Sequence, residues 1–300
     1  ALGFQAANAL TTGANNTALG YQALDSATSG SHNTTVGRLA GYNITSGVIN
    51  TIIGYNAGYG VTTSGNNVFI GGQTGESITG GSGKNIAIGN ACMRNVSVDG
   101  AFSVAIGHDA FRYGTGDNTV AIGYEAAKGA SGSTTTNTVA VGHQALTALT
   151  TGAGNTAVGY QAGDAITTAG YNTVVGHGAG VGTSNSGTVM GYQASGKGSG
   201  VVAIGYQAQG GTVTNGFQNT GVGYQANYNG ASEKNVSIGT KAGYGGSVRS
   251  VSVGHSAGYS GADNGVFIGF EAGLNETGSN KLYIENSSSA TPLIYGEFDN

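Results

Sequence analysis

Histidine, cysteine and acidic side chains are the groups of this 300-residue sequence that could catalyse a reaction or bind a metal. Four of the five histidines share one context, the position directly after a glycine, and these are His108, His143, His177 and His255. In other places the same position holds an aromatic ring, as at Tyr21, Tyr55 and Phe270. A position that exchanges His for Tyr and Phe predicts a column of partly exposed rings, because a metal site would need His itself.

Cys92 and the carboxylates do not form a recognisable catalytic group. The single cysteine stands where nearly every copy of the repeat described below has Ala, and no His and Asp recur at a matching offset. We therefore expect a buried, unreactive thiol. The fourteen Asp and Glu residues are scattered and form no recurring pair of the kind that cleaves glycosidic bonds. We expect a protein that is not an enzyme and that holds no cofactor or metal.

Glycine dominates the composition and limits the fold class. It accounts for 59 residues, whereas Pro and Cys occur once each and charged residues make up 8%. Glycine inside a helix costs about 1 kcal/mol relative to Ala, which argues against a helical fold, and the single Pro excludes collagen. Hydrophobic residues at 38% and a net charge of −4 argue against disorder and against a nucleic-acid partner. No apolar run approaches the ~20 residues that cross a bilayer, so we expect no membrane insertion.

A repeat of about 17 residues runs through most of the chain. Its consensus is Asn-Thr-x-aliphatic-Gly-Tyr-x-Ala, as in residues 16–23 and 155–162. We use the glycine of each copy as an anchor, and the seventeen anchors are Gly3, Gly20, Gly37, Gly54, Gly71, Gly89, Gly107, Gly123, Gly142, Gly159, Gly176, Gly191, Gly205, Gly223, Gly239, Gly254 and Gly269. The chain starts inside a copy of the repeat, so we expect it to be a piece of a longer protein.

The residues before each anchor predict a short strand. The residue directly before the anchor is apolar in every copy, and the residue three before it is β-branched wherever it exists, as in Val104 and Ile106. This alternation has the period of a strand with one buried face. We expect these two columns to point inward, the Asn four residues before the anchor to hydrogen-bond along the stack, and the glycine to form a corner. The connecting half of some copies, such as residues 44–47, suggests a second, shorter strand.

Stacking of these copies predicts an all-β, parallel β-solenoid of the left-handed β-roll or β-helix type, with about 17 coils of ~17 residues. We expect the solenoid over residues 1–273 and a C-terminal cap, or a linker to a further domain, over residues 274–300. Each coil offers about two large apolar side chains for burial, which is little against the entropy of ordering ~17 residues. We therefore expect the chain to associate with two further copies of itself into a homotrimer.

Two parts of the sequence resemble known families. Residues 118–123 (Asn-Thr-Val-Ala-Ile-Gly), 103–107 and 235–239 resemble the head repeat of trimeric autotransporter adhesins, and the longer Asn-Thr-x-aliphatic-Gly-Tyr-Gln-Ala form is more similar to repeats of bacteriophage tail fibres. The resemblance implies a left-handed parallel β-roll, three chains wide, that binds host surface components. Residues 280–286 and 292–298 are similar to the segment that often precedes an endosialidase-type intramolecular chaperone domain, which trimerises such fibres and is then cleaved off.

From the repeat and these resemblances we expect a structural or adhesive fibre protein, on a virion tail fibre or at a cell surface. Its role would be host attachment, through a surface that binds a glycan or protein receptor. Variable loops at residues 73–84 and 128–136 could contribute to that surface. Five tyrosines outside the main aromatic column are candidate receptor contacts: Tyr42, Tyr59, Tyr113, Tyr228 and Tyr259.

The sequence leaves three alternatives open. The chain could be the head of a bacterial trimeric autotransporter-type adhesin, a polysaccharide depolymerase with carboxylates paired between chains, or an ice-binding solenoid. Threonines such as Thr17, Thr34 and Thr51 lie in one column, as on ice-binding faces, but we expect them to point into the core. Release of reducing sugars would identify a depolymerase, and a membrane anchor downstream in the gene would identify an adhesin.

Overall fold

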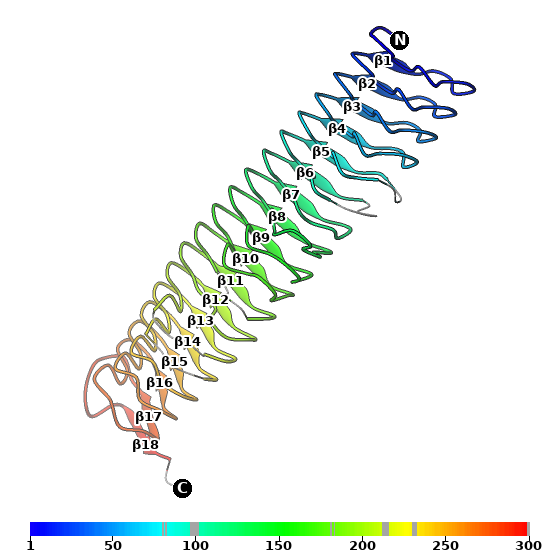
Figure 1. Cartoon of the computed structure of the whole chain (residues 1–300). Coiled ribbons are helices and arrows are strands. Elements are labelled where there is room, and N and C mark those ends of the chain that lie inside the picture. Colours follow the sequence, from blue (N-terminus) through cyan, green and yellow to red (C-terminus); the bar gives the residue numbers. More distant parts are fainter. Residues whose placement is uncertain are drawn as a thin grey trace. The chain divides into compact units, whose positions relative to one another are not determined.

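The computed structural model describes residues 1–79, 81, 83–96, 102–180, 182, 184–211, 216–229 and 233–298. The chain divides into two units, Ala1–Asn155 and Thr156–Asn300. In both units the described coils form a parallel β-solenoid, as Figure 1 shows, and the chain makes about 15 turns of ~17 residues. The all-β parallel solenoid predicted from the sequence is confirmed. None of the described residues forms a helix that could span a lipid bilayer.

The first unit has one short strand in each coil. Its strands are β1 (Thr17–Leu19), β2 (Thr34–Val36), β3 (Thr51–Ile53), β4 (Val68–Ile70), β5 (Ile86–Ile88), β6 (Val104–Ile106), β7 (Val120–Ile122) and β8 (Val139–Val141). Neighbouring strands pair parallel and in register, so that Thr34 lies between Thr17 and Thr51. Each strand ends directly before an anchor glycine, where the repeat predicts it.

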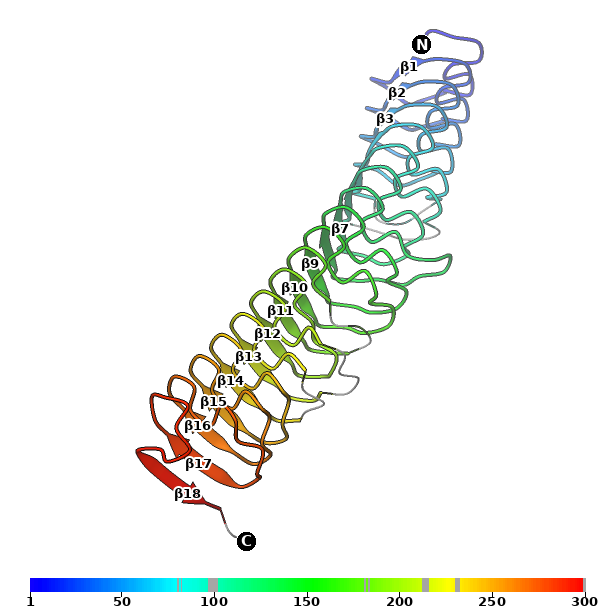
Figure 2. The ribbon, with the colours of Figure 1, turned by 90° about the vertical axis from the view of Figure 1, so that its left-hand side faces the viewer.

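The second unit continues the same pattern and ends in a hairpin. Its strands are β9 (Thr156–Val158), β10 (Thr173–Val175), β11 (Thr188–Met190), β12 (Val202–Ile204), β13 (Thr220–Val222), β14 (Val236–Ile238), β15 (Val251–Val253), β16 (Val266–Ile268), β17 (Lys281–Ile284) and β18 (Ile294–Glu297). Strands β9 to β17 pair parallel, and β18 pairs antiparallel with β17. The hairpin of β17 and β18 is the last layer of this unit (Figure 2).

The number of complete turns is slightly lower than the 17 coils predicted. Sixteen strands, β1 to β16, each precede an anchor, and a complete turn runs from one strand to the next, which gives about 15 turns. The first anchor, Gly3, belongs to an incomplete coil. Only an isolated bridge between Leu2 and Leu19 represents its strand.

The direction of the strand side chains is opposite to the one predicted. In β3 the middle residue Ile52 is buried, whereas Thr51 and Ile53 point outward, and every strand from β1 to β16 has a buried middle residue. The two columns expected inside therefore lie outside. An alternating pattern is compatible with either face being buried, and a coil closed by sharp turns has room for only one, mostly small, side chain per strand. Ala is the most frequent residue at this middle position, as at Ala105 and Ala121.

Two further positions contribute to the core. The small residue three positions after the anchor is buried, as in Ala57, and in several coils so is an aliphatic residue seven positions after it, as in Ile44 and Ile166. The described residues around these aliphatic positions form turns and bends, so the second strand suggested by the sequence is not found there. Their backbone still bonds to the next coil, since the N–H of Thr45 donates to the carbonyl of Thr62 at 2.9 Å.

Buried asparagines link successive coils. Asn33, Asn50 and Asn67 lie four residues before their anchors and are almost completely buried. The amide nitrogen Nδ2 of Asn50 donates to Oδ1 of Asn33 at 3.0 Å and to the carbonyl of Ser64 at 3.1 Å. Oδ1 of Asn50 accepts from Nδ2 of Asn67 at 3.0 Å and from its backbone N–H at 3.1 Å. The asparagine column predicted from the repeat is confirmed.

Candidate interaction surface

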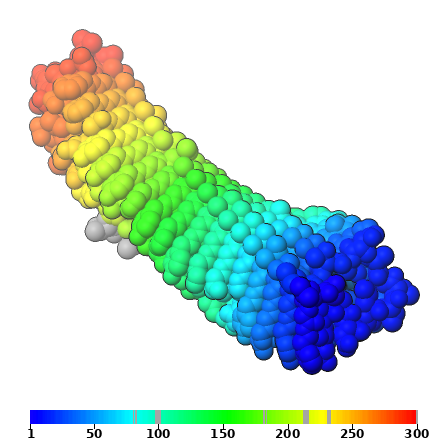
Figure 3. Space-filling model, turned by 90° about the horizontal axis from the view of Figure 1, so that it is seen from above, coloured from blue at the N-terminus to red at the C-terminus, as the bar shows by residue number. Residues whose placement is uncertain are grey.

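The outward face of the strands forms an uncharged surface on the first unit. Directly before the anchors the outward residues are Leu19, Val36, Ile53, Ile70, Ile88, Ile106, Ile122 and Val141. Three residues before the anchors they are Thr17, Thr34, Thr51, Val68, Ile86, Val104, Val120 and Val139. All sixteen side chains are aliphatic or Thr, and the exposed fraction is 43% for Leu19 and 37% for Ile53. Successive coils of the unit lie as adjacent layers (Figure 3), so the two columns are continuous.

The second unit presents the same kind of face. Directly before its anchors the outward residues are Val158, Val175, Met190, Ile204, Val222, Ile238, Val253 and Ile268. Three residues before the anchors they are Thr156, Thr173, Thr188, Val202, Thr220, Val236, Val251 and Val266. The register of β17 places Leu282 beside Val266 and Ile284 beside Ile268, which extends both columns into the terminal hairpin.

The residues directly after the anchors form the predicted column of stacked rings. His108 and His143 lie on opposite sides of Tyr124, with ring centroids 5.7 and 5.0 Å away and planes tilted by 19°. His177 in the second unit lies in the same way between two tyrosines. The aromatic column explains these histidines. Among the described residues, no three His, Cys, Asp or Glu side chains gather where they could hold a metal ion.

Arg38 shows why this column accepts a side chain that is not aromatic. Its guanidinium carbon lies 5.7 Å from the ring centroid of Tyr21 and 5.4 Å from that of Tyr55, so that the planar cation takes the place of a ring between the two. Stacking of a guanidinium on aromatic faces is favourable. The interruption of the sequence pattern at this position therefore does not interrupt the stack.

Four of the five candidate receptor tyrosines belong to a second column, which the sequence analysis missed. Tyr42 and Tyr59 stack at 5.3 Å in the first unit, and Tyr228, Tyr244 and Tyr259 stack at 5.3 and 4.8 Å in the second. Each of these five stacked tyrosines lies five residues after an anchor, and this constant offset in the sequence could have revealed the second column. Because the stacked rings cover one another's faces, these tyrosines present ring edges and hydroxyl groups.

Tyr113, the remaining candidate, lies outside that column. It is six residues after its anchor, and the guanidinium of Arg112 lies 5.0 Å from its ring centroid. The structure therefore places four of the five candidates in two local stacks, and it places Tyr113 apart from both. Of the candidate receptor loops, residues 80 and 82 in the segment 73–84 lie outside the described residues.

A strip of ion pairs follows the second column through the middle coils of the first unit. Arg94, Arg112 and Lys128 occupy the position five after their anchors. Nε of Arg94 lies 2.6 Å from Glu76, Nη1 of Arg112 lies 3.1 Å from the Asp109 carboxylate, and Nζ of Lys128 lies 2.6 Å from Oε1 of Glu125. The three acids neutralise the three cations, so this strip offers no net positive charge to an anion.

Glu125 has a second partner in this strip. Besides Lys128, the amide nitrogen of Gln144 donates to its Oε2 at 2.9 Å. Hydrogen bonds from Lys128 and Gln144 hold the pKa of the Glu125 carboxyl below its usual range. A lowered folded-state pKa means that this contribution to stability is present above the unfolded carboxyl pKa and is lost as the pH falls through the folded one.

Cys92 has the buried position that was expected. Its side chain is completely buried and its Sγ lies 3.2 Å from the carbonyl oxygen of Ala105, as a donor. Burial raises the pKa of the thiol to about 12, so the thiolate is scarcely populated at neutral pH. Because the thiolate is the reactive form, this cysteine is not a nucleophile in the folded coil.

Comparisons with known proteins add no assignment: no family model matches the sequence, and no curated protein matches it.

Proposed function

We propose that the chain is a structural fibre protein whose copies associate through the outward strand faces, and that the assembled fibre presents a surface for host attachment. The supporting observation is the composition of these faces. Thirty-two outward positions on β1 to β16 carry Thr, Val, Ile, Leu or Met and no charge. Soluble monomers rarely expose continuous apolar patches of this kind, and such patches are typical of protein interfaces. Burial against further copies also supplies the apolar contact that a single coil lacks.

Three copies are the number that we propose. Each face is only two columns wide, so three coil stacks around a common axis let one column of each chain pack against a column of the next. This arrangement closes without leaving an unpaired face, as in other cyclic oligomers. The resemblance of the repeat to trimeric adhesin heads and to phage tail fibres supports the same number, as does the likeness of residues 280–286 and 292–298 to a segment found before a trimerising domain. A virion tail fibre or a cell surface is the location consistent with such a protein.

Lysine substitutions in the outward columns test the assembly. The double variant Ile53→Lys, Ile106→Lys places two charges on the face without changing the interior, because both side chains point outward. We expect its mass by light scattering to fall from that of three chains to that of one, with an unchanged β signal in circular dichroism. Ser46→Lys, at an exposed position away from the strands, is the matched control and should stay trimeric. A double variant with the mass of the wild type would contradict the proposed interface.

The tyrosine column is the proposed site of receptor contact. Tyr42 and Tyr59 lie in turns outside the strand face, so association through that face leaves them accessible. We expect Tyr42→Ala, Tyr59→Ala to lower binding to host cells and to a glycan array by at least about fivefold, while the fibre stays assembled. Ser46→Ala is the control. Binding equal to that of the wild type would exclude these two residues as contacts.

The outward direction of the threonines supports a second candidate function. The expectation that these side chains lie inside argues against ice binding, but this expectation is wrong: Thr17, Thr34 and Thr51 point outward in a regular column. The neighbouring outward column is aliphatic, and this composition suits an interface between chains at least as well as it suits an ice-binding face. If the protein is a monomer in solution and lowers the freezing point of water below the melting point of ice, that result would favour ice binding over assembly.

A further inference from the structure

The terminal hairpin of the second unit surrounds a hollow that the proposed assembly does not explain. Tyr283, Ala290, Thr291, Pro292 and Tyr295 line a hollow of about 330 Å³. A smaller hollow of about 120 Å³ shares Tyr283 and Ala290 with it and extends to Glu276. The repeat pattern does not reveal this hollow, because the irregular C-terminal segment that forms it occurs only once in the chain.

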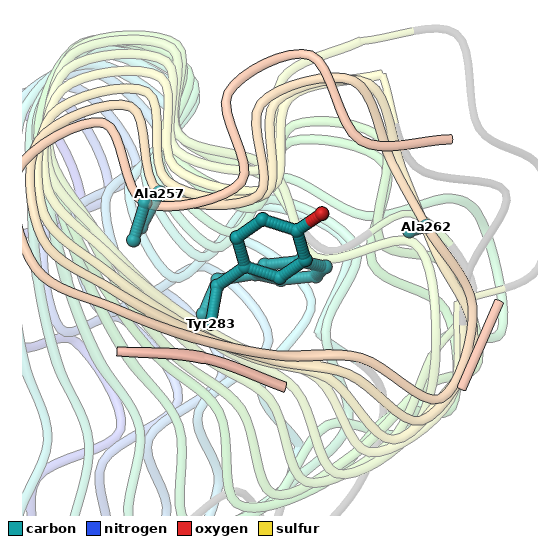
Figure 4. Packing of buried hydrophobic residues seen from close by; sticks show 5 residues of the cluster. Ala257, Ala262 and Tyr283 are labelled. Carbon is teal, nitrogen blue, oxygen red and sulfur yellow. The ribbon is translucent and has the colours of Figure 1, made fainter. Parts of the chain in front are cut away.

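Two aromatic rings at right angles form the corner of this hollow. Tyr283 continues the inward column and lies over Phe267, with centroids 5.8 Å apart, so that it closes the core of the unit (Figure 4). The ring of Tyr295 is perpendicular to that of Tyr283, with centroids 5.4 Å apart. No coil wraps β18 among the described residues, and Tyr295 therefore remains 49% exposed. Pro292 adds an apolar wall.

A carboxylate increases the negative character of this corner. The hydroxyl of Tyr283 donates to Oε2 of Glu276 at 2.6 Å, and the N–H of Gly278 donates to Oε1 at 2.6 Å. Burial acts against ionisation, but these hydrogen bonds hold the pKa of the Glu276 carboxyl below its usual range. A phenol that donates to a carboxylate gains electron density in its ring, which strengthens attraction of a cation to the ring face.

The hairpin already holds one ammonium group beside an aromatic ring. Nζ of Lys281 lies 5.6 Å from the ring centroid of Tyr295, donates to its hydroxyl at 3.0 Å and pairs with Glu297. Residues 274–298 contain three carboxylates, Glu276, Glu285 and Glu297, and this single lysine. This terminal segment thus has an excess of negative charge, and Glu276 lines the smaller hollow.

We propose that this hollow binds an alkylated ammonium group. The methyl groups of such a cation fit the apolar walls made by Tyr283, Tyr295 and Pro292. Its positive charge interacts with the exposed ring of Tyr295 and lies beside the smaller hollow that Glu276 lines. An anion would be repelled by the carboxylates. A neutral sugar would gain nothing from the excess of negative charge.

The same ammonium chemistry occurs in a trimethyllysine side chain and in a phosphocholine headgroup. The hollow favours the first source, because no described residue that lines it carries a positive charge for the phosphate, and Lys281 beside Tyr295 is already paired with Glu297. A trimethyllysine peptide should therefore bind, and vesicles of phosphatidylcholine should not. Binding of the vesicles without binding of the peptide would overturn this choice of source.

Titration of the whole chain with choline and with its neutral analogue 3,3-dimethylbutan-1-ol tests the proposal. We expect calorimetry or NMR shifts to show at least about tenfold tighter binding of choline, and Tyr295→Leu to weaken that binding by about the same factor. Tyr171→Leu, at a 74% exposed position of the same unit outside the hairpin, is the matched control and should bind as the wild type does. Circular dichroism establishes that both variants are folded. Equal binding of the neutral analogue, binding of methyl glucoside in place of choline, or no effect of Tyr295→Leu would overturn the proposal.

Discussion

Gly123→Ala is expected to destabilise the first unit by at least about 3 kcal/mol and to shift its unfolding midpoint in urea accordingly. Gly123 has a φ of +134°, which is unfavourable for residues with a side chain. A Cβ at this position would also lie within 3.0 Å of the carbonyl oxygen of Gly142 in the next coil. Since the added Cβ is fixed directly to the backbone and the atom that it meets is a backbone carbonyl oxygen, the coils themselves would have to separate, and the hydrogen bonds between them would weaken.

Gly132→Ala separates the two causes. Its φ of +85° is also positive, but no atom lies within 4 Å of an added Cβ. This variant should therefore lose only about 1 kcal/mol, the cost of the backbone conformation. If the two variants had the same urea midpoint, close packing of successive anchor glycines would not explain the repeat.

Asn50→Leu is expected to cost about 2–6 kcal/mol. The substitution removes the acceptor for the backbone N–H of Asn67 and the donor to the carbonyl of Ser64, and both residues are buried. A buried polar group without a partner costs about 1–3 kcal/mol, and Leu cannot replace either bond. We expect a lower urea midpoint and faster amide hydrogen exchange at Asn67.

Asn66→His is the matched control for this substitution. Asn66 is exposed and lies five residues before its anchor, where another coil has His32 with nearly the same positive φ. The control should change the midpoint by no more than about 0.5 kcal/mol. Slow exchange at Asn67 in Asn50→Leu would show that the asparagine column does not hold the coils together.

The sequence was sufficient to predict the strands and the bonds along the stack. A β-branched residue three before each anchor and an apolar residue directly before it set the position of every strand from β1 to β16. The column of Asn33, Asn50 and Asn67 followed from identical residues at identical offsets, because stacked coils place such residues one above another. The stacked rings of His108 and Tyr124 followed from the same rule.

The direction of the strands and the sites on irregular segments were beyond the sequence pattern. The alternation of Val104, Ala105 and Ile106 has the same period whichever face is inside, and only the narrowness of the coil decides that Ala105 is buried. The proposed interface between chains also requires apolar residues on the outward face of the strands, so in the sequence these residues look like those of a core. The hollow at Tyr283 and Tyr295 depends on a hairpin that occurs once, so no repetition could reveal it.

The mass of the intact chain in solution tests the proposed assembly most directly. Sedimentation equilibrium at micromolar concentration should give about 88 kDa, three times the chain mass of 29.4 kDa. A mass of 29.4 kDa under the same conditions would mean that the outward columns of Thr, Val, Ile, Leu and Met face water, and it would contradict the proposal that they join copies of the chain.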